Sequence, residues 1–273
     1  MPESRQEKYF LAMSLPLLVL LVAVSAVGLF TKNFYWRETS NWATQAIAQD
    51  AVDLFFISPV LLVTSILAYK NNFIATMIWG GTILFLIYTF GIYCFAVHFN
   101  PLFLPYCFIF GLSVYSFVYF LNVNLKMLPV FVFNKKLPWK FAAVYLIAVS
   151  VLFYLLWLSE IIPASFFGTT PKSFVDTGIF TNPVHVIDLS ICLPGLFIVA
   201  VLLLKKKNAG VILTLPAILF CAEMSISIGV LIVFMKLRGL ATDLTPLYFM
   251  GVIAAGGIWF FVNFILNRQP ITS

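Results

Sequence analysis

Charged residues are scarce in this chain. Only 10% of its 273 residues are Asp, Glu, Lys or Arg, whereas 62% are hydrophobic and the mean hydropathy is +1.05. A soluble globular domain has about 25% charged residues and about 45–50% apolar residues. The shortage of charge therefore excludes a soluble globular domain and predicts an all-α integral membrane protein.

Histidine and cysteine are also rare. The chain has two histidines, His98 and His185, and four cysteines without CxxC spacing, namely Cys94, Cys107, Cys192 and Cys221. All four cysteines lie in apolar segments, where a free cysteine usually acts as a small apolar residue, so no disulfide framework is indicated. P-loop, HExxH and G-x-S-x-G motifs are absent, which removes the enzyme classes that these motifs mark.

Eight long apolar runs fill most of the chain, and each approaches or exceeds the ~20 residues that a helix needs to cross a bilayer. The predicted spans are residues 9–31, 47–69, 73–97, 101–123, 139–161, 184–204, 208–235 and 246–266. The first run is longer than the apolar region of a signal peptide, so we expect it to be retained as a helix.

Lysine and arginine residues set the expected orientation. With the N-terminus inside, eleven of the 16 basic residues fall on the inner side and five on the outer side. The positive-inside rule then predicts that both termini are cytoplasmic. We expect no targeting extension, and this expectation favours the bacterial inner membrane over an organelle. Because loop lysines and arginines explain the net charge of +6, we expect no nucleic-acid partner. The expected partners are the bilayer and a small solute, ion or lipid, and the sequence leaves a homo-oligomer open.

The second and sixth spans resemble each other. Three distinctive residues recur after 135 positions: Asp53 as Asp188, Pro59 as Pro194 and Lys70 as Lys205. A further match at a shift of 145 places His98 on Asp243. The pattern predicts two parallel four-helix repeats, residues 1–125 and 136–273, joined by a basic cytoplasmic loop at 126–135. Chance is the competing explanation.

Six polar residues fall at the outer ends of the predicted spans: Asp50, Asp53, His98, His185, Asp188 and Asp243. Helix N-capping is the simplest role for Asp50 and Asp243. Asp53 and Asp188 lie about one turn inside their helices, where a carboxylate needs water or a partner. The sequence therefore predicts an outer ring of acids and histidines that binds a substrate or an ion.

Glu223 is predicted near the middle of the seventh span. An ionisable group at this depth is costly and marks a functional site by default. A protonated carboxyl that donates a hydrogen bond to another helix is the structural alternative. Pro59 and Pro194 lie inside their spans, where each predicts either a static kink or a hinge.

A metal site is a further hypothesis, although any cofactor is unknown from the sequence. His98, His185, Asp53 and Asp188 offer nitrogen and oxygen ligands suited to zinc or another divalent ion. Their spacing matches no known metal motif.

Three functions remain open from the sequence. The favoured one is a small transporter or channel for an ion or small solute. The alternatives are a membrane-embedded enzyme whose metal or acid–base site opens to the outer face, and a non-catalytic binding or assembly subunit. A polar path from the outer acids past Glu223 favours transport, whereas convergence of the histidines with Asp53 and Asp188 favours an enzyme.

Overall fold

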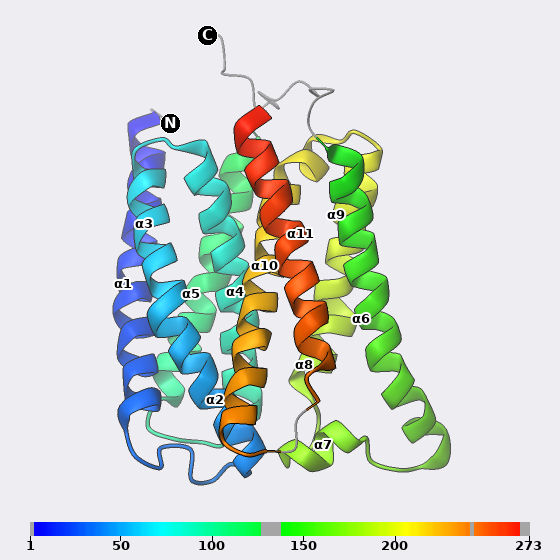
Figure 1. Ribbon diagram of the computed structural model, residues 1–273. Coiled ribbons are helices and arrows are strands. Elements are labelled where there is room, and N and C mark those ends of the chain that lie inside the picture. Colours follow the sequence, from blue (N-terminus) through cyan, green and yellow to red (C-terminus); the bar gives the residue numbers. More distant parts are fainter. Residues whose placement is uncertain (1–2, 127–137, 241–242, 268–273) are drawn as a thin grey trace.

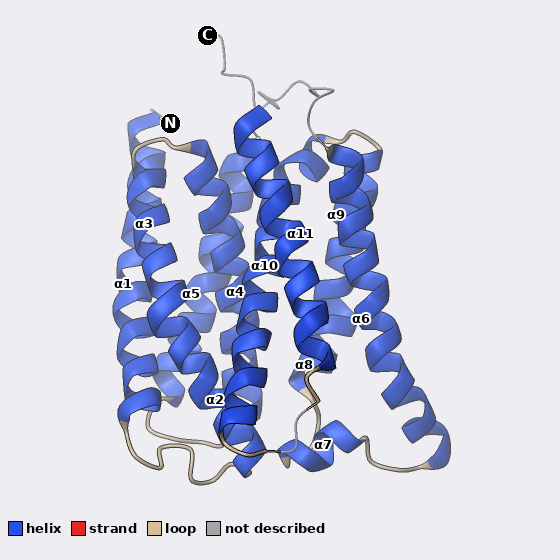
Figure 2. Cartoon of the chain, in the orientation of Figure 1, coloured by secondary structure: helices blue, strands red, loops and turns tan. Residues whose placement is uncertain are grey.

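The computed structural model describes residues 3–126, 138–240 and 243–267, and this part of the chain is helical without a strand (Figure 2). Eight helices in it are long and apolar enough to span a membrane. They cover Tyr9–Phe30, Ser40–Tyr69, Phe73–Ala96, Phe103–Asn124, Trp139–Phe167, Pro183–Leu204, Asn208–Leu237 and Thr245–Asn267. The eight predicted spans are therefore confirmed.

The helices follow one another in a simple order. The first half contains α1 (Glu3–Phe30), α2 (Ser40–Val52), the π-helix η1 (Asp53–Ile57), α3 (Ser58–Tyr69), α4 (Phe73–Ala96) and α5 (Phe103–Asn124). The second half contains α6 (Trp139–Phe167), α7 (Lys172–Thr177), α8 (Pro183–Ile187), the π-helix η2 (Asp188–Cys192), α9 (Leu193–Leu204), α10 (Asn208–Leu237) and α11 (Thr245–Asn267).

Two helix boundaries correct the sequence prediction. The second span begins at Ser40 rather than at residue 47, because the Thr39 hydroxyl caps it by accepting a hydrogen bond from the Trp42 N–H at 3.2 Å. The fifth span continues past Pro163 to Phe167, and Gly168 ends it with a φ of 64°. The predicted outer loops 32–46 and 162–183 are thus partly helical.

A π-helix interrupts both the second and the sixth span just before the proline. The Ser58 N–H bonds to the Asp53 carbonyl, and the Leu193 N–H bonds to the Asp188 carbonyl, each five residues back. A proline clashes with the carbonyl four residues before it in a regular α-helix, and the wider π turn gives that carbonyl room. Each predicted kink is therefore a π turn that begins at an aspartate.

The bundle has its two halves on either side of α4 and α10 (Figure 1). In the first half α1 contacts α3 and α5, and α4 also contacts α3 and α5. In the second half α6 contacts α9 and α11, and α10 also contacts α9 and α11. The two central helices approach closely at Gly81, where a Cβ would lie 2.9 Å from the Pro216 carbonyl oxygen.

The helix α1 begins and α11 ends at the same end of the bundle (Figure 1). The connections 70–72 and 205–207 lie at this end as well, and the connection 31–39 lies with α7 at the opposite end. Of the predicted basic loop 126–135, residues 127–135 lie outside the described residues, as do Lys136 and Arg268.

Candidate functional site

A chain of hydrogen-bonded side chains joins the second span to α10. Asp53, the first residue of η1, is fully buried, and its Oδ1 accepts a hydrogen bond from Gln49 Nε2 at 2.8 Å. The Gln49 Oε1 in turn accepts a hydrogen bond from the Ser227 hydroxyl of α10 at 2.7 Å. One carboxyl is thus connected across a helix interface through an amide and a hydroxyl.

Asp50 lies one turn before Asp53 and is also buried. Its Oδ2 accepts a hydrogen bond from the Tyr35 hydroxyl at 2.7 Å, and its Oδ1 accepts one from the Tyr93 hydroxyl at 3.0 Å. The N-cap role predicted for Asp50 is wrong, because the helix begins ten residues earlier, at Ser40. Two tyrosines from other segments hold this carboxyl instead.

Glu223 is buried in the interior of α10, four residues before Ser227 and therefore on the same face of that helix. Its Oε1 accepts a hydrogen bond from the Thr82 hydroxyl of α4 at 2.8 Å. Glu223 thus faces α4 in the centre of the bundle, while its helix contacts α2 nearer the end of the bundle where α7 lies.

Two oxygens of these acids are left without a hydrogen bond. Within the described residues, Asp53 Oδ2 and Glu223 Oε2 are buried and have no partner. Leaving a buried carboxylate oxygen unpaired costs free energy on the order of 1–3 kcal/mol, and more when the group is charged. A bound proton or small cation removes this cost, so the arrangement is suited to cation binding.

Asp188 begins η2 as Asp53 begins η1, but it differs from Asp53 in its hydrogen-bond partners. Its Oδ2 accepts a hydrogen bond from the Trp157 Nε1 at 2.7 Å, and the Tyr88 hydroxyl of α4 interacts with the same carboxyl. A cavity of about 50 Å³ lies beside it, lined by residues that include Tyr88, Cys192, Cys221 and Met224. Asp188 is therefore a carboxyl with its partners already in place.

His185 is buried between aromatic rings. The centroid of its ring lies 4.4 Å from that of Trp157 and 5.6 Å from that of Phe174. Neither ring nitrogen has a hydrogen-bond partner among the described residues. Trp157 thus lies against His185 and also holds Asp188, so it links the two predicted residues.

His98 and Asp243 lie apart from the buried acids, on surface connections. The His98 Nδ1 lies 2.9 Å from Glu38 Oε2, and the His98 backbone N–H donates to Glu38 Oε1 at 2.7 Å. Asp243 Oδ1 accepts a hydrogen bond from the Thr245 N–H at 2.9 Å and caps α11, as the sequence predicts. His98 and Asp243 are therefore not members of the hydrogen-bonded network around Asp50, Asp53 and Glu223.

Ligands for a metal ion do not gather in the described residues. No group of three or more His, Cys, Asp and Glu side chains there could hold a metal ion. His98 pairs with Glu38, and His185 lies among aromatic rings, so neither histidine is a member of the hydrogen-bonded network of Asp53.

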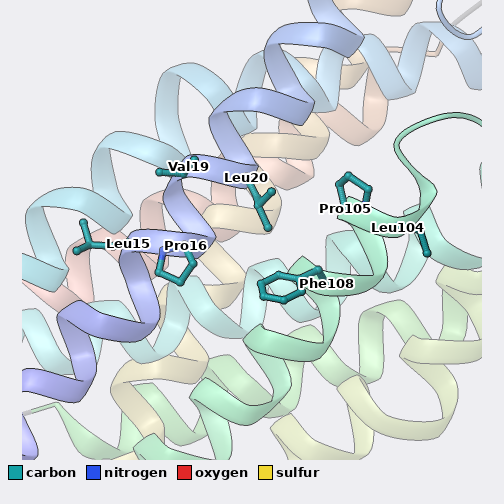
Figure 3. Close-up of a pocket in the computed structure, with 7 residues that line it drawn as sticks. All are labelled: Leu15, Pro16, Val19, Leu20, Leu104, Pro105 and Phe108. Carbon is teal, nitrogen blue, oxygen red and sulfur yellow. The ribbon is translucent and has the colours of Figure 1, made fainter.

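An apolar groove lies on the surface of the bundle, between α1 and α5. It encloses about 640 Å³ and is lined by Leu15, Pro16, Val19, Leu20, Leu104, Pro105 and Phe108 (Figure 3). These side chains offer no hydrogen-bonding group to a polar ligand. We therefore place the candidate site at the buried acids and not in this groove.

Several residues of the hydrogen-bonded network cannot be predicted from the sequence. Tyr35, Thr82 and Tyr93 come from other segments, and aromatic or hydroxyl side chains are too common in this chain to mark a site. Gln49 carried a usable signal, because it precedes Asp53 by four residues and so lies on the same helix face.

Comparison of the chain with protein-family models, with characterised proteins and with solved structures found no match. The function is therefore inferred from the geometry of the buried acids alone.

The Asp243 cap makes a testable contribution at acidic pH. Hydrogen bonds from Thr245 lower the pKa of Asp243 below its ordinary value of 3.8, so its carboxylate supports α11 above that pH and loses this role as the pH falls through the lowered pKa. We expect Asp243→Ala to lower the melting temperature at pH 7 and the difference from wild type to shrink below pH 3.8. Asp243→Asn, which caps without a charge, is the control and should keep its cap across this range. A difference from wild type that is constant with pH would contradict the role of the charge.

Proposed function

We propose that this protein is a membrane transporter that carries a proton or another small cation on the carboxyl groups of Asp53 and Glu223. The observation that carries the proposal is the pair of buried oxygens without partners, Asp53 Oδ2 and Glu223 Oε2. Both belong to helices that meet through the Gln49–Ser227 hydrogen bond. Ionisable groups inside a membrane bundle typically mark ion pathways and proton relays.

The proton is the cation that this site favours most. A buried carboxylate that lacks a counter-charge pays a large desolvation cost, which protonation removes. A metal cation needs several oxygens around one point, whereas a proton needs only one carboxyl oxygen and no cavity. Gln49 and Ser227 then connect a proton-binding carboxyl at Asp53 to α10 through two hydrogen bonds.

The proposed architecture is two parallel four-helix repeats, residues 1–125 and 136–273. Two observations support this architecture: matching helix positions along the chain and matching contacts between helices. The π-helices at 53–57 and 188–192 are 135 residues apart, as are the twelve-residue helices α3 and α9 that follow them. The contact of α2 with α10 has a counterpart in the contact of α8 with α4, as a two-fold axis along the membrane normal requires.

The two repeats differ at the position that decides the chemistry. A shift of 135 places Tyr88 on Glu223. Tyr88 interacts with the acid of the opposite repeat, Asp188, whereas Glu223 accepts a hydrogen bond from Thr82 of α4 and so brings a second carboxyl into the half of the bundle that contains Asp53. We therefore assign cation binding to the Asp53 and Glu223 side and a structural role to Asp188.

The proposed orientation has both termini in the cytoplasm of a bacterial inner membrane. The end where α1 begins carries Lys70, Lys126, Lys140 and the run Lys205–Lys207. The opposite end carries Lys32, Arg37, Lys172, Lys236 and Arg238. The excess at the first end supports a cytoplasmic position for it.

Reconstitution into liposomes tests the proposal directly. The purified chain is placed in vesicles that contain a pH-sensitive dye, and a pH step is applied with the membrane potential clamped by potassium and valinomycin. We expect the protein to speed the internal pH change well beyond that of protein-free vesicles. Parallel vesicles with a sodium gradient and a sodium-sensitive dye distinguish a proton from a sodium ion.

A matched control separates transport from leakage. His98→Ala changes an exposed residue of the outer surface that lies outside the buried network, so its flux should match that of the wild type. Equal rates for the wild type and for protein-free vesicles with both ions would contradict cation transport.

A further inference from the structure

Two of the four cysteines face each other across neighbouring helices. The sulfur of Cys94, near the end of α4, lies 4.0 Å from the sulfur of Cys107, near the start of α5. Both thiols are free and partly exposed. A disulfide requires a sulfur–sulfur distance of about 2.05 Å, so the two atoms must approach by roughly 2 Å for a bond to form.

Each cysteine of the pair follows a tyrosine in the sequence, and one of these two tyrosines is a partner of Asp50. Cys94 follows Tyr93, which donates to the Asp50 carboxyl, and Cys107 follows Tyr106. The two tyrosine rings contact each other edge to face, with centroids 5.0 Å apart. A covalent bond between the cysteines would therefore fix the spacing of the two helix ends that carry this tyrosine pair.

We propose that Cys94 and Cys107 are a disulfide-forming site at the outer face of the protein. The proposal rests on the orientation given above, which places the connection between α4 and α5 outside the cytoplasm, and it does not depend on the transported ion. Disulfides form and persist in the periplasm and other oxidising compartments. The oxidant that reacts with the two thiols is a small disulfide compound, which accepts two electrons.

The reaction is a thiol–disulfide exchange in two steps. The thiolate of Cys94 attacks one sulfur of the acceptor disulfide, forms a mixed disulfide and releases one acceptor thiol. The thiolate of Cys107 then attacks the Cys94 sulfur and releases the second acceptor thiol. The protein loses two electrons and two protons, and the acceptor leaves as two thiols.

Thiol counting on the full chain tests the site. The reconstituted protein is incubated with glutathione disulfide, its free thiols are blocked in detergent with N-ethylmaleimide, and it is then reduced and labelled with a polyethylene glycol maleimide. We expect two labels on the monomer band. Cys192→Ser/Cys221→Ser should also take two labels, because these cysteines lie around the cavity of the other half, and Cys94→Ser/Cys107→Ser should take none.

Thermal melting tests whether the bond braces the outer end. Closing a loop of this length should raise the melting temperature of the oxidised protein on the order of 5 °C above that of the reduced protein. Cys94→Ser/Cys107→Ser should show no difference between the two conditions. If the wild type takes no label, or if Cys94→Ser/Cys107→Ser is still labelled, the proposed disulfide between Cys94 and Cys107 is wrong. If the disulfide forms but the melting temperature does not rise, the bond does not stabilise the outer end of the bundle.

Discussion

Gly28→Ala should lower the melting temperature of the purified protein by roughly 10 °C, because a methyl group at this position collides with Asp50, a buried acid whose two oxygens both accept hydrogen bonds. The added Cβ would overlap Asp50 Oδ2 and would lie 2.7 Å from the Tyr35 hydroxyl oxygen. Both atoms belong to one 2.7 Å hydrogen bond, so neither can move away without breaking it.

The size of this effect follows from two contributions. Overpacking a core costs about 1–3 kcal/mol, and loss of a buried hydrogen bond to a charged group costs about 1.5–3 kcal/mol. Asp50 cannot turn towards water, because it is only 2% exposed and Tyr93 holds its other oxygen. The change is therefore among the most destabilising single-methyl additions that this chain offers.

Gly111→Ala is the matched control for Gly28→Ala. Gly111 lies inside α5, and nothing lies within 4 Å of its added Cβ. Alanine favours a helix over glycine by about 1 kcal/mol, so this variant should melt at or slightly above the wild-type temperature. If both alanine variants melt alike, the tight packing of α1 against Asp50 is wrong.

Hydropathy was sufficient to locate all eight spans, because a membrane helix must be apolar over its whole length. It failed at Ser40–Ala46, where Asn41, Thr44 and Gln45 resemble a loop. The structure satisfies these polar groups inside the helix: Thr44 donates to the Ser40 carbonyl, and Gln45 donates to Asn41. This unrecognised helical extension is also why Asp50 was interpreted as a cap.

The candidate site could be predicted as a set of acids but not as a network. Asp53 and Glu223 stand out in the sequence because carboxyl groups are rare in apolar segments. Their partners depend on which helices meet, and no spacing rule in one chain connects Thr82 with Glu223 or Gln49 with Ser227. The π-helices at Asp53 and Asp188 also lack a sequence signature beyond the following proline, so the shape of each acid site could not be foreseen.

Glu223→Gln should reduce the proton flux of the reconstituted protein by about 100-fold, the lower end of what a positioned proton-transfer group contributes. Glutamine has nearly the same shape, and its carbonyl oxygen still accepts the hydrogen bond from Thr82, but it cannot take up and release a proton. Asp53→Asn should have a similar effect for the same reason. The melting temperature of each variant shows whether the fold is preserved.

The double variant decides whether the two acids act together. If Asp53 and Glu223 serve one pathway, the flux of Asp53→Asn/Glu223→Gln should equal that of the slower single variant, because groups that act as a unit are not additive. Two independent pathways would instead give a partial loss in each single variant and a complete loss only in the double variant. Asp188→Asn supplies the matched control from the other half, since its carbonyl still accepts the Trp157 hydrogen bond, and its flux should stay close to that of the wild type. A loss at Asp188 equal to that at Asp53 would show that both halves of the bundle carry the ion, and the assignment of cation binding to one side of the bundle would be wrong.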